Sequence, residues 1–223
     1  INKRMSATSG VGTLNSPVDG LVTDAVKKAD MLNDYFSSVF VNDDGNLPAF
    51  ARRVPENVSL NAVTVSREAI LKFIQKCKPG TSPGPDNIPV AFLKQFRFLL
   101  VEPLFILFTY LITLGQIPAD WKLANITPVF KKSIASDVSN YRSQSLTSVF
   151  CKLFERIVQE TMLEYLLENK LISNQQHGFL SKRSTCTQLL EVVNDWSIAL
   201  RNHHVVDVIY FDISKAFDTV DHT

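Results

Sequence analysis

The run that most constrains the fold of this chain lies near its end, where residues 205–211 read VVDVIYF. Such an apolar, β-branched run is typical of a strand buried inside a sheet. Asp212 follows directly, and Asp218 and Asp221 come soon after it. A carboxylate at the end of a buried strand is rigidly held and still meets solvent. We therefore expect Asp212 either to bind a divalent metal such as Mg²⁺ or to cap a turn.

The composition limits the class of protein. With 223 residues the chain is long enough for one or two domains, and its net charge of +1 gives no overall signature of a nucleic-acid partner. Cys77, Cys151 and Cys186 are too dispersed for a zinc motif and odd in number, so a reducing, intracellular compartment is expected. The apolar stretch 104–114 is too short to span a bilayer and predicts a buried helix, with no membrane partner.

Hydrophobic periodicity and helix-end signals predict a helix-rich α+β chain. Residues 1–22 are expected to form a flexible lead-in and residues 42–63 an irregular linker. The expected helices cover residues 24–41, 66–79, 89–100, 102–115, 145–170 and 185–201, and the expected strands cover 123–130 and 205–211. Pro128 marks the first strand as an edge strand, because proline donates no ladder hydrogen bond.

Basic side chains bracket the connection that follows this edge strand. Lys131 and Lys132 stand at its start and Arg142 at its end. Lysine supplies a point charge to a phosphate and arginine a planar fork, so together they are suited to hold a triphosphate. The alternative interpretation is an ordinary solvated loop.

Local charge gives a weaker indication of a nucleic-acid surface. Between Lys122 and Arg183, nine basic residues stand against five acidic ones. Lys182 and Arg183 lie just before Ser184, the expected cap of the helix over 185–201. The pair is placed to touch a phosphate backbone, although an ordinary surface turn fits the same residues.

Four blocks in a fixed order give the chain a resemblance to a known family. They read KPGTSPGPDNIPVAFLK, IPADWKLANITPVFKKSIASDVSNYRSQSLTSVFCKLFERIV, NQQHGFLSKRSTCTQLLEV and VIYFDISKAFDTVDH. From about residue 20 onward, the sequence resembles the reverse transcriptases of non-LTR (LINE-type, jockey-like) retrotransposons. The last block is similar to polymerase motif A, which carries the first catalytic aspartate of these enzymes.

The resemblance implies roles for individual residues. Asp212 matches the catalytic, metal-binding aspartate, and Ile213 matches the next residue, whose backbone carbonyl also faces the metal and nucleotide. Phe217 matches the bulky residue that excludes the ribose 2′-OH of the nucleotide. Lys131 and Arg142 match the residues that grip the incoming triphosphate, and Asp218 and Asp221 are expected to be structural or surface carboxylates.

The implied architecture is a partial right-hand polymerase, with the fingers and the beginning of the palm. Residues 1–63 would be a lead-in and linker with one helix over 24–41, residues 64–204 the fingers region, and residues 205–223 the start of the palm. The implied partners are an RNA template, a DNA primer and dNTPs, with Mg²⁺ as cofactor for two-metal nucleotidyl transfer. Nuclear and cytoplasmic localisation follows by family analogy.

Two departures from the family pattern qualify this reading. Ser143 and Gln144 stand where the family has proline and an apolar residue, which gives the backbone an extra N–H after Arg142. The second metal-binding block of the family, a Tyr/Phe-x-Asp-Asp hairpin, does not occur before Thr223. We therefore expect this fragment to be inactive on its own. The alternative is a non-catalytic nucleic-acid-binding or interaction protein derived from a retroelement remnant.

Overall fold

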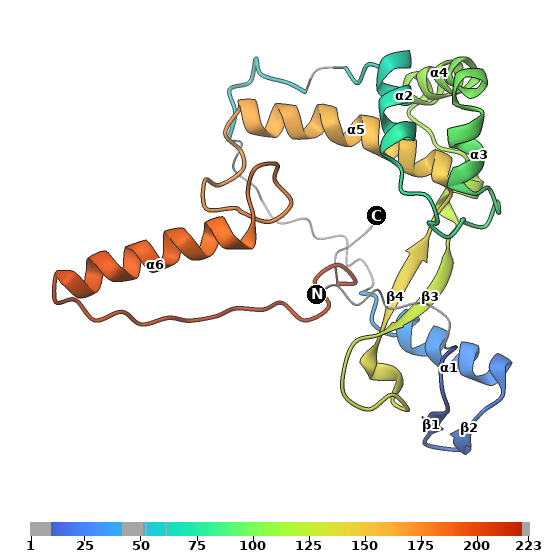
Figure 1. The fold of residues 1–223 in the computed structure, drawn as a ribbon, viewed down its shortest axis with the longest axis horizontal. Helices are drawn as coiled ribbons and strands as arrows, with labels where there is room; N and C mark the ends of the chain where they lie inside the picture. The colour runs from blue at the N-terminus through green and yellow to red at the C-terminus, as the bar shows by residue number, and fades with distance from the viewer. Residues whose placement is uncertain (1–9, 42–50, 52, 61, 220–223) are drawn as a thin grey trace. The chain divides into compact units, whose positions relative to one another are not determined.

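The computed structural model describes residues 10–41, 51, 53–60 and 62–219, with helices and two small antiparallel sheets (Figure 1). The chain divides into two compact units. The first unit comprises residues 1–47, 63–158 and 215–223, and the second comprises 48–62 and 159–214. The predicted mixture of helix and sheet, with helix in excess, is confirmed.

Helices build the main core of the first unit. Helix α2 (Arg67–Lys76) begins as predicted, because the Ser66 side chain accepts a hydrogen bond of 3.1 Å from the Ala69 N–H. It packs with α3 (Val90–Gln95), α4 (Arg97–Leu114) and the first half of α5 (Val149–Glu168). The buried core residues are Ile70, Phe73, Ile74, Val90, Leu93, Leu104, Phe108, Leu111, Val149, Leu153, Phe154 and Ile157.

A bidentate ion pair joins α2 to α4 at the surface of this core. Arg67 donates from Nε and Nη2 to the two carboxylate oxygens of Glu102, at 2.6 and 2.7 Å. The guanidinium also lies 3.8 Å from the centre of the Phe105 ring. These hydrogen bonds lower the pKa of Glu102 and raise that of Arg67. Since both side chains are about half exposed, the pair fixes geometry more than it adds stability.

The structure places the boundary between the two helices predicted over 89–100 and 102–115 at Phe96. The first helix ends at Gln95, and α4 runs from Arg97, so Pro103 falls inside α4 rather than in its first turn. Proline removes the hydrogen bond that the carbonyl four residues earlier would accept. Core packing by Leu104, Phe108 and Leu111 directly after Pro103 keeps the helix intact.

Helix α4 is only partly buried, in contrast to the prediction. Leu104, Phe108 and Leu111 face the core, but Leu99 and Ile106 are 74% and 61% exposed. The sequence hides this division because α4 is apolar on every face. Within the described residues it is the one helix whose length and apolar composition would let it cross a membrane, and 17% of that stretch is buried. The expectation of a buried helix is therefore correct for one face only.

Two strands, β3 (Asn125–Phe130) and β4 (Tyr141–Leu146), form an antiparallel hairpin. The predicted strand over 123–130 is confirmed, but β4 was missed, and the helix predicted from residue 145 begins at Val149. The polar residues Ser143, Gln144 and Ser145 resemble a connection when the sequence is considered alone. Their strand conformation comes from pairing with β3.

The N-terminal region contains a second hairpin where a flexible lead-in was predicted. Strands β1 (Leu14–Ser16) and β2 (Gly20–Val22) pair, and α1 (Ala25–Ser37) follows with Asp24 as its cap. Leu14 is fully buried against Leu32 and Tyr141. A few apolar residues in a polar segment are enough to order it. Half of the linker predicted over 42–63 lies outside the described residues, and its described half contains no helix or strand.

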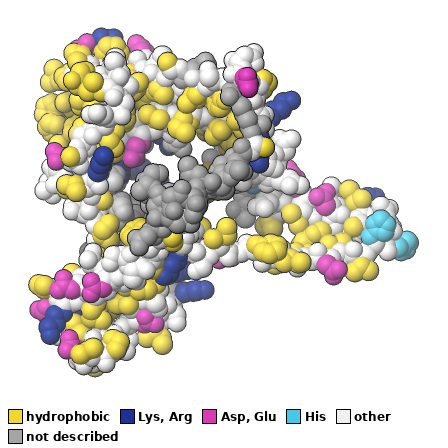
Figure 2. Space-filling view, turned by 180° about the vertical axis from the view of Figure 1, so that it is seen from behind, with side chains coloured by type: hydrophobic (Ala, Val, Ile, Leu, Met, Phe, Trp, Pro, Cys, Tyr) yellow, Lys and Arg dark blue, Asp and Glu magenta, His cyan; other side chains and the backbone are white. Residues whose placement is uncertain are grey.

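The second unit contains the end of α5 and helix α6 (Thr185–Arg201), which matches its predicted range. Ser184 and Thr187 form a reciprocal capping box at its start. None of its residues is buried, and its exposed hydrophobic residues include Leu189, Leu190 and Leu200. Figure 2 shows hydrophobic side chains, in yellow, gathered on the arm that ends in the cyan histidines.

The strand predicted over 205–211 is wrong. Residues 204–213 carry no secondary structure, and Val205, Tyr210 and Phe211 are 88%, 85% and 89% exposed (Figure 1). An apolar run becomes a strand only when a neighbouring strand accepts its backbone hydrogen bonds. Within the described parts of the chain, no segment pairs with this run.

Candidate functional site

The β3–β4 hairpin brings together the two residues expected to grip a triphosphate. Arg142 lies opposite Val129 in the strand register, and the Lys131 N–H donates to the Asn140 carbonyl at 2.8 Å. Side chains alternate between the two faces of a strand. Arg142 and Lys131 therefore share one face of the hairpin, opposite to the face that carries Phe130 and Tyr141.

An aromatic pair anchors the other face of the hairpin. The rings of Phe130 and Tyr141 lie 5.5 Å apart, centre to centre, in a tilted arrangement. Tyr141 is 7% exposed, and its hydroxyl donates to the Ala135 carbonyl at 2.7 Å. This packing holds the backbone from which Lys131 and Arg142 project.

The connection between the strands is ordered by its own hydrogen bonds. It contains a short 3-10 helix, η2 (Val138–Asn140), and the Asp137 carboxylate accepts from the Ser139 N–H at 2.8 Å. That hydrogen bond lowers the pKa of Asp137. The Asn140 side chain donates to the Ile134 carbonyl at 3.0 Å. The connection is thus a defined turn that fixes where each strand begins and ends.

The face of the hairpin that carries Lys131 and Arg142 is positively charged. Lys131 and Arg142 are both exposed. In the ranges that the structure describes, no carboxylate lies within ion-pair distance of either side chain. Two uncompensated cations on one rigid hairpin can bind a polyanion such as a triphosphate.

The residues that resemble motif A lie on an exposed segment. Asp212 is exposed, and Ile213 and Phe217 are 74% and 81% exposed. Asp212 and Ile213 belong to the second unit and Phe217 to the first. The described residues hold no group of three or more His, Cys, Asp or Glu that could bind a metal. The structure thus brings Lys131 and Arg142 together, whereas among the described residues no cluster of metal ligands includes Asp212.

The predicted nucleic-acid pair, Lys182 and Arg183, lies in the turn before α6. The Arg183 guanidinium donates to the backbone carbonyls of Asn174 and Gln176. Arg183 is therefore occupied in holding the turn together. Lys182 is exposed and lies in the turn at residues 181–182, where its φ of 63° puts the backbone in the left-handed region.

His177 is a feature of this turn to which the sequence assigned no role. Its side chain is 3% exposed, and its ring nitrogens lie 2.9 Å from Thr187 Oγ1 and 3.0 Å from Glu191 Oε2. The histidine thus ties the turn to the first two turns of α6. The sequence signal that could have indicated this role was the position of His177 in the family block NQQHGFLSKRSTCTQLLEV. A single sequence does not show, however, that a histidine is buried.

Comparison with known proteins identifies the family that the chain resembles. Residues 129–223 match the sequence profile of the family described as reverse transcriptase (RNA-dependent DNA polymerase). Over these residues the chain resembles part of a reverse transcriptase domain. The matched region of this domain begins within β3 and includes Lys131, Arg142, Lys182, Arg183, Asp212, Ile213 and Phe217.

Individual relatives agree with the reverse transcriptase assignment. The chain is 26% identical over 169 residues to a probable RNA-directed DNA polymerase from transposon BS of Drosophila melanogaster, covering 75% of this chain and 19% of the relative. It is 28% identical over 171 residues to the RNA-directed DNA polymerase from mobile element jockey of Drosophila funebris, covering 76% and 19%. The resemblance to non-LTR retrotransposon reverse transcriptases is confirmed. The chain spans about a fifth of the length of these relatives.

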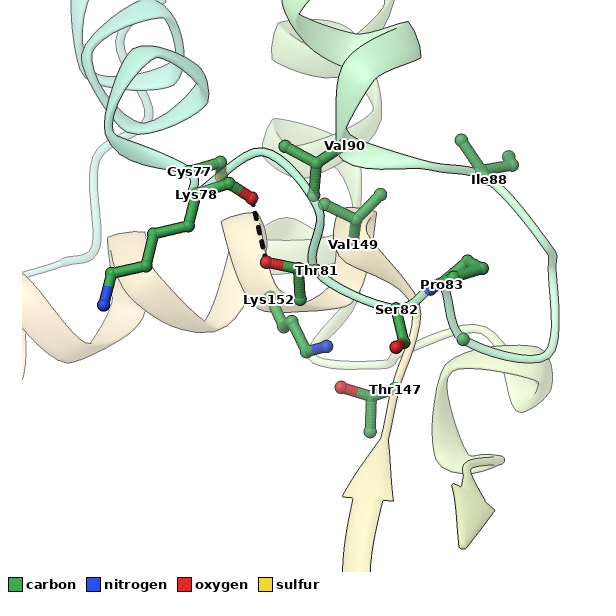
Figure 3. A pocket seen from close by; sticks show the side chains of 11 residues that line it. Cys77, Lys78, Thr81, Ser82, Pro83, Ile88, Val90, Thr147, Val149 and Lys152 are labelled. Carbon is green, nitrogen blue, oxygen red and sulfur yellow. Dashed lines mark hydrogen bonds between the residues drawn. The ribbon is translucent and has the colours of Figure 1, made fainter. Parts of the chain in front are cut away.

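A proline-rich loop precedes the matched part of the reverse transcriptase domain and packs against it. Residues 79–88 fold over the start of α5, where Gly84 lies next to Thr147, and Pro83 and Thr147 line the same pocket (Figure 3). A small, apolar pocket lies beneath the loop, lined in part by Val90 and Val149. The Thr81 hydroxyl donates to the Lys78 carbonyl at 2.9 Å and tightens the turn at its start. The loop is thus a packed part of the first unit.

The cysteines of this reverse transcriptase region differ in reactivity. Cys151 is 3% exposed, and burial together with the Glu155 carboxylate raises the pKa of its thiol to about 12. Cys186 is exposed. Because the thiolate is the nucleophile, burial and the raised pKa both keep the Cys151 thiol unreactive near pH 8. We expect iodoacetamide to label Cys186 in the native protein and Cys151 only after addition of denaturant, as measured by peptide mass spectrometry. Equal labelling rates in the native protein would contradict the burial of Cys151.

Proposed function

We propose that this chain forms the nucleotide-binding fingers and the first part of the palm of an RNA-directed DNA polymerase. One observation supports the proposal most strongly. Lys131 and Arg142 project from the same face of one hairpin, and no carboxylate among the described residues pairs with either of them. The reverse transcriptase match covers both residues.

The proposed roles of the hairpin residues follow from phosphate chemistry. Phosphoryl transfer depends mainly on positioning and on stabilising charge. Arg142 would bind two phosphate oxygens through its planar guanidinium, and Lys131 would add a second positive charge. Phe217 would select a deoxyribose through its bulk. The exposed positions of all three side chains leave them accessible to a nucleotide.

Mg²⁺ is the cofactor that this proposal implies. Asp212 offers one exposed carboxylate, and the Ile213 carbonyl follows it directly. Mg²⁺ accepts one or two protein oxygens when phosphate oxygens and water complete its shell, so these donors fit a nucleotide-bound ion. When bound, the ion would neutralise phosphate charge. The described residues contribute no fuller cluster of ligands.

The template RNA and the DNA primer are the proposed macromolecular partners. Contacts to their backbones would be independent of sequence and sensitive to salt. Lys182, exposed in the turn before α6, is suited to such a contact. Arg183 would act indirectly, because its guanidinium holds the carbonyls of Asn174 and Gln176.

Substitutions on the hairpin test the proposed nucleotide site. We expect Arg142→Ala and Lys131→Ala each to weaken binding of dTTP with Mg²⁺ by about tenfold, because each removes a hydrogen bond between charged groups. Isothermal titration calorimetry measures the affinities. Lys76→Ala is the matched control, since it removes the same charge from an exposed lysine of α2, and it should change the affinity by less than about twofold. Equal losses in all three variants would indicate a diffuse charge effect and contradict the proposed site.

A non-catalytic RNA-binding role is the second candidate, favoured by the excess of nine basic over five acidic residues between Lys122 and Arg183. Binding of this kind would fall steeply as salt increases and would not require a triphosphate. Salt-dependent RNA binding without any affinity for dTTP would therefore favour this candidate over the polymerase fragment.

A further inference from the structure

The loop over residues 79–88 makes direct backbone contact with the segment that links β4 to α5. Gly84 is buried, and a Cβ built on it would lie 2.5 Å from both the Ser148 nitrogen and the Thr147 carbonyl carbon. Real Cβ atoms do not approach backbone this closely. Only glycine lets the loop lie so near to the link.

Asp86 connects this loop to the link through its side chain. The Ser148 hydroxyl donates to Asp86 Oδ2 at 2.5 Å, and the Ile88 N–H donates to Oδ1 at 3.1 Å. The carboxylate therefore holds its own loop in shape with one oxygen and reaches the link with the other. Hydrogen bonds to a charged acceptor are stronger than neutral ones, so this contact is well suited to fix position.

Ser148 is the point at which the strand becomes a helix. Its side chain is buried, and its hydroxyl oxygen accepts from the Phe150 N–H at 3.2 Å in the first turn of α5. Thr147 alone separates Ser148 from the end of β4 at Leu146. The hydroxyl group thus binds Asp86 as a donor and the helix start as an acceptor. Ser148 therefore lies at the junction where β4 leads into α5.

We infer that Asp86 is a positioning residue for the nucleotide-binding hairpin. Through Ser148 it fixes the base of β4, the strand that carries Arg142, relative to the helical core. Gly84 permits the close approach that this requires. The inference rests on the proposed function, because it assigns to Asp86 an effect on triphosphate binding that is exerted through Arg142.

A purely structural role would give a different result in a double-mutant cycle. If Asp86 acts through Arg142, its removal should matter only while Arg142 is present. If Asp86 merely stabilises the fold, its removal should weaken binding by the same factor in either background. The cycle uses wild type, Asp86→Ala, Arg142→Ala and the double variant, each titrated with dTTP and Mg²⁺.

We expect Asp86→Ala to weaken dTTP binding by about fivefold in the wild-type background and by less than about twofold in the Arg142→Ala background. Asp86→Asn keeps an oxygen acceptor and should recover part of the affinity. Ser148→Ala removes the donor of the same hydrogen bond and should reproduce the loss, which keeps the test available if Asp86→Ala fails to fold. Asp30→Ala, an exposed aspartate on α1, is the matched control and should have no effect.

Failure of the positioning role and failure of the proposed nucleotide site give different results. If Arg142→Ala weakens dTTP binding while Asp86→Ala and Ser148→Ala do not, the positioning role is overturned and the nucleotide site stands. Equal losses from Asp86→Ala in both backgrounds also overturn the positioning role. If Arg142→Ala leaves the affinity unchanged, the proposed nucleotide site itself is overturned, together with the inference that depends on it.

Discussion

Phe108→Ala is expected to lower the free energy of unfolding by about 3–5 kcal/mol. The Phe108 ring is fully buried in the helical core, with the Phe154 ring centre 5.4 Å away and the Trp121 ring centre 6.1 Å away. Truncation to alanine removes these contacts and leaves a cavity between α4 and α5. Because neighbouring helices relax only in part, the cavity adds to the loss of buried apolar area.

Chemical denaturation of the purified chain measures this effect. Phe98→Ala is the matched control, since it removes the same side chain from the same helix at a position that is 67% exposed. Its effect should stay below about 1 kcal/mol. Equal destabilisation by the two variants would mean that α4 does not bury Phe108 as described.

Gly84→Ala is the second substitution with a large expected effect. The new methyl group would lie 2.5 Å from backbone atoms of Thr147 and Ser148, and backbone cannot turn aside as a flexible side chain can. Overpacking of this kind costs about 1–3 kcal/mol. We also expect the loop to lift from the start of α5, which should appear as faster amide hydrogen exchange over residues 79–88.

A second glycine provides the control for this prediction. A Cβ on Gly12 would meet nothing within 4 Å, and no positive φ is recorded there. Gly12→Ala should therefore change stability by less than about 0.5 kcal/mol. If Gly84→Ala is as harmless as Gly12→Ala, the loop does not pack on the 147–148 backbone.

Local signals in the sequence predicted the elements that are stabilised locally. Ser66 caps α2 and Ser184 caps α6 as expected, because capping depends on a few neighbouring residues. The features that were missed depend on residues distant in the chain. Strand β4 carries polar residues and is a strand because β3 pairs with it. Residues 205–211 have a strand-like composition, yet no described segment pairs with them.

In the candidate site, too, the sequence predicted local features but not those that depend on residues distant in the chain. The family motifs indicated Lys131 and Arg142, but their shared face became apparent only from the register of the hairpin. The hydrogen bond between Asp86 and Ser148 joins residues that lie 62 positions apart, so no local sequence pattern predicts it. Arg183 was expected to contact nucleic acid, yet its guanidinium binds the Asn174 and Gln176 carbonyls, and only the three-dimensional turn brings those groups within reach.

The comparison of dTTP with dTMP, titrated against the wild-type chain with Mg²⁺, tests the central claim most directly. The two ligands share a base and a sugar and differ in the phosphates that Lys131 and Arg142 are proposed to hold. The proposed site predicts that dTTP binds at least about tenfold more tightly than dTMP, and that Arg142→Ala removes most of this difference. Equal affinities for the two ligands, or a difference that survives Arg142→Ala, would contradict the assignment of the β3–β4 hairpin as the triphosphate site.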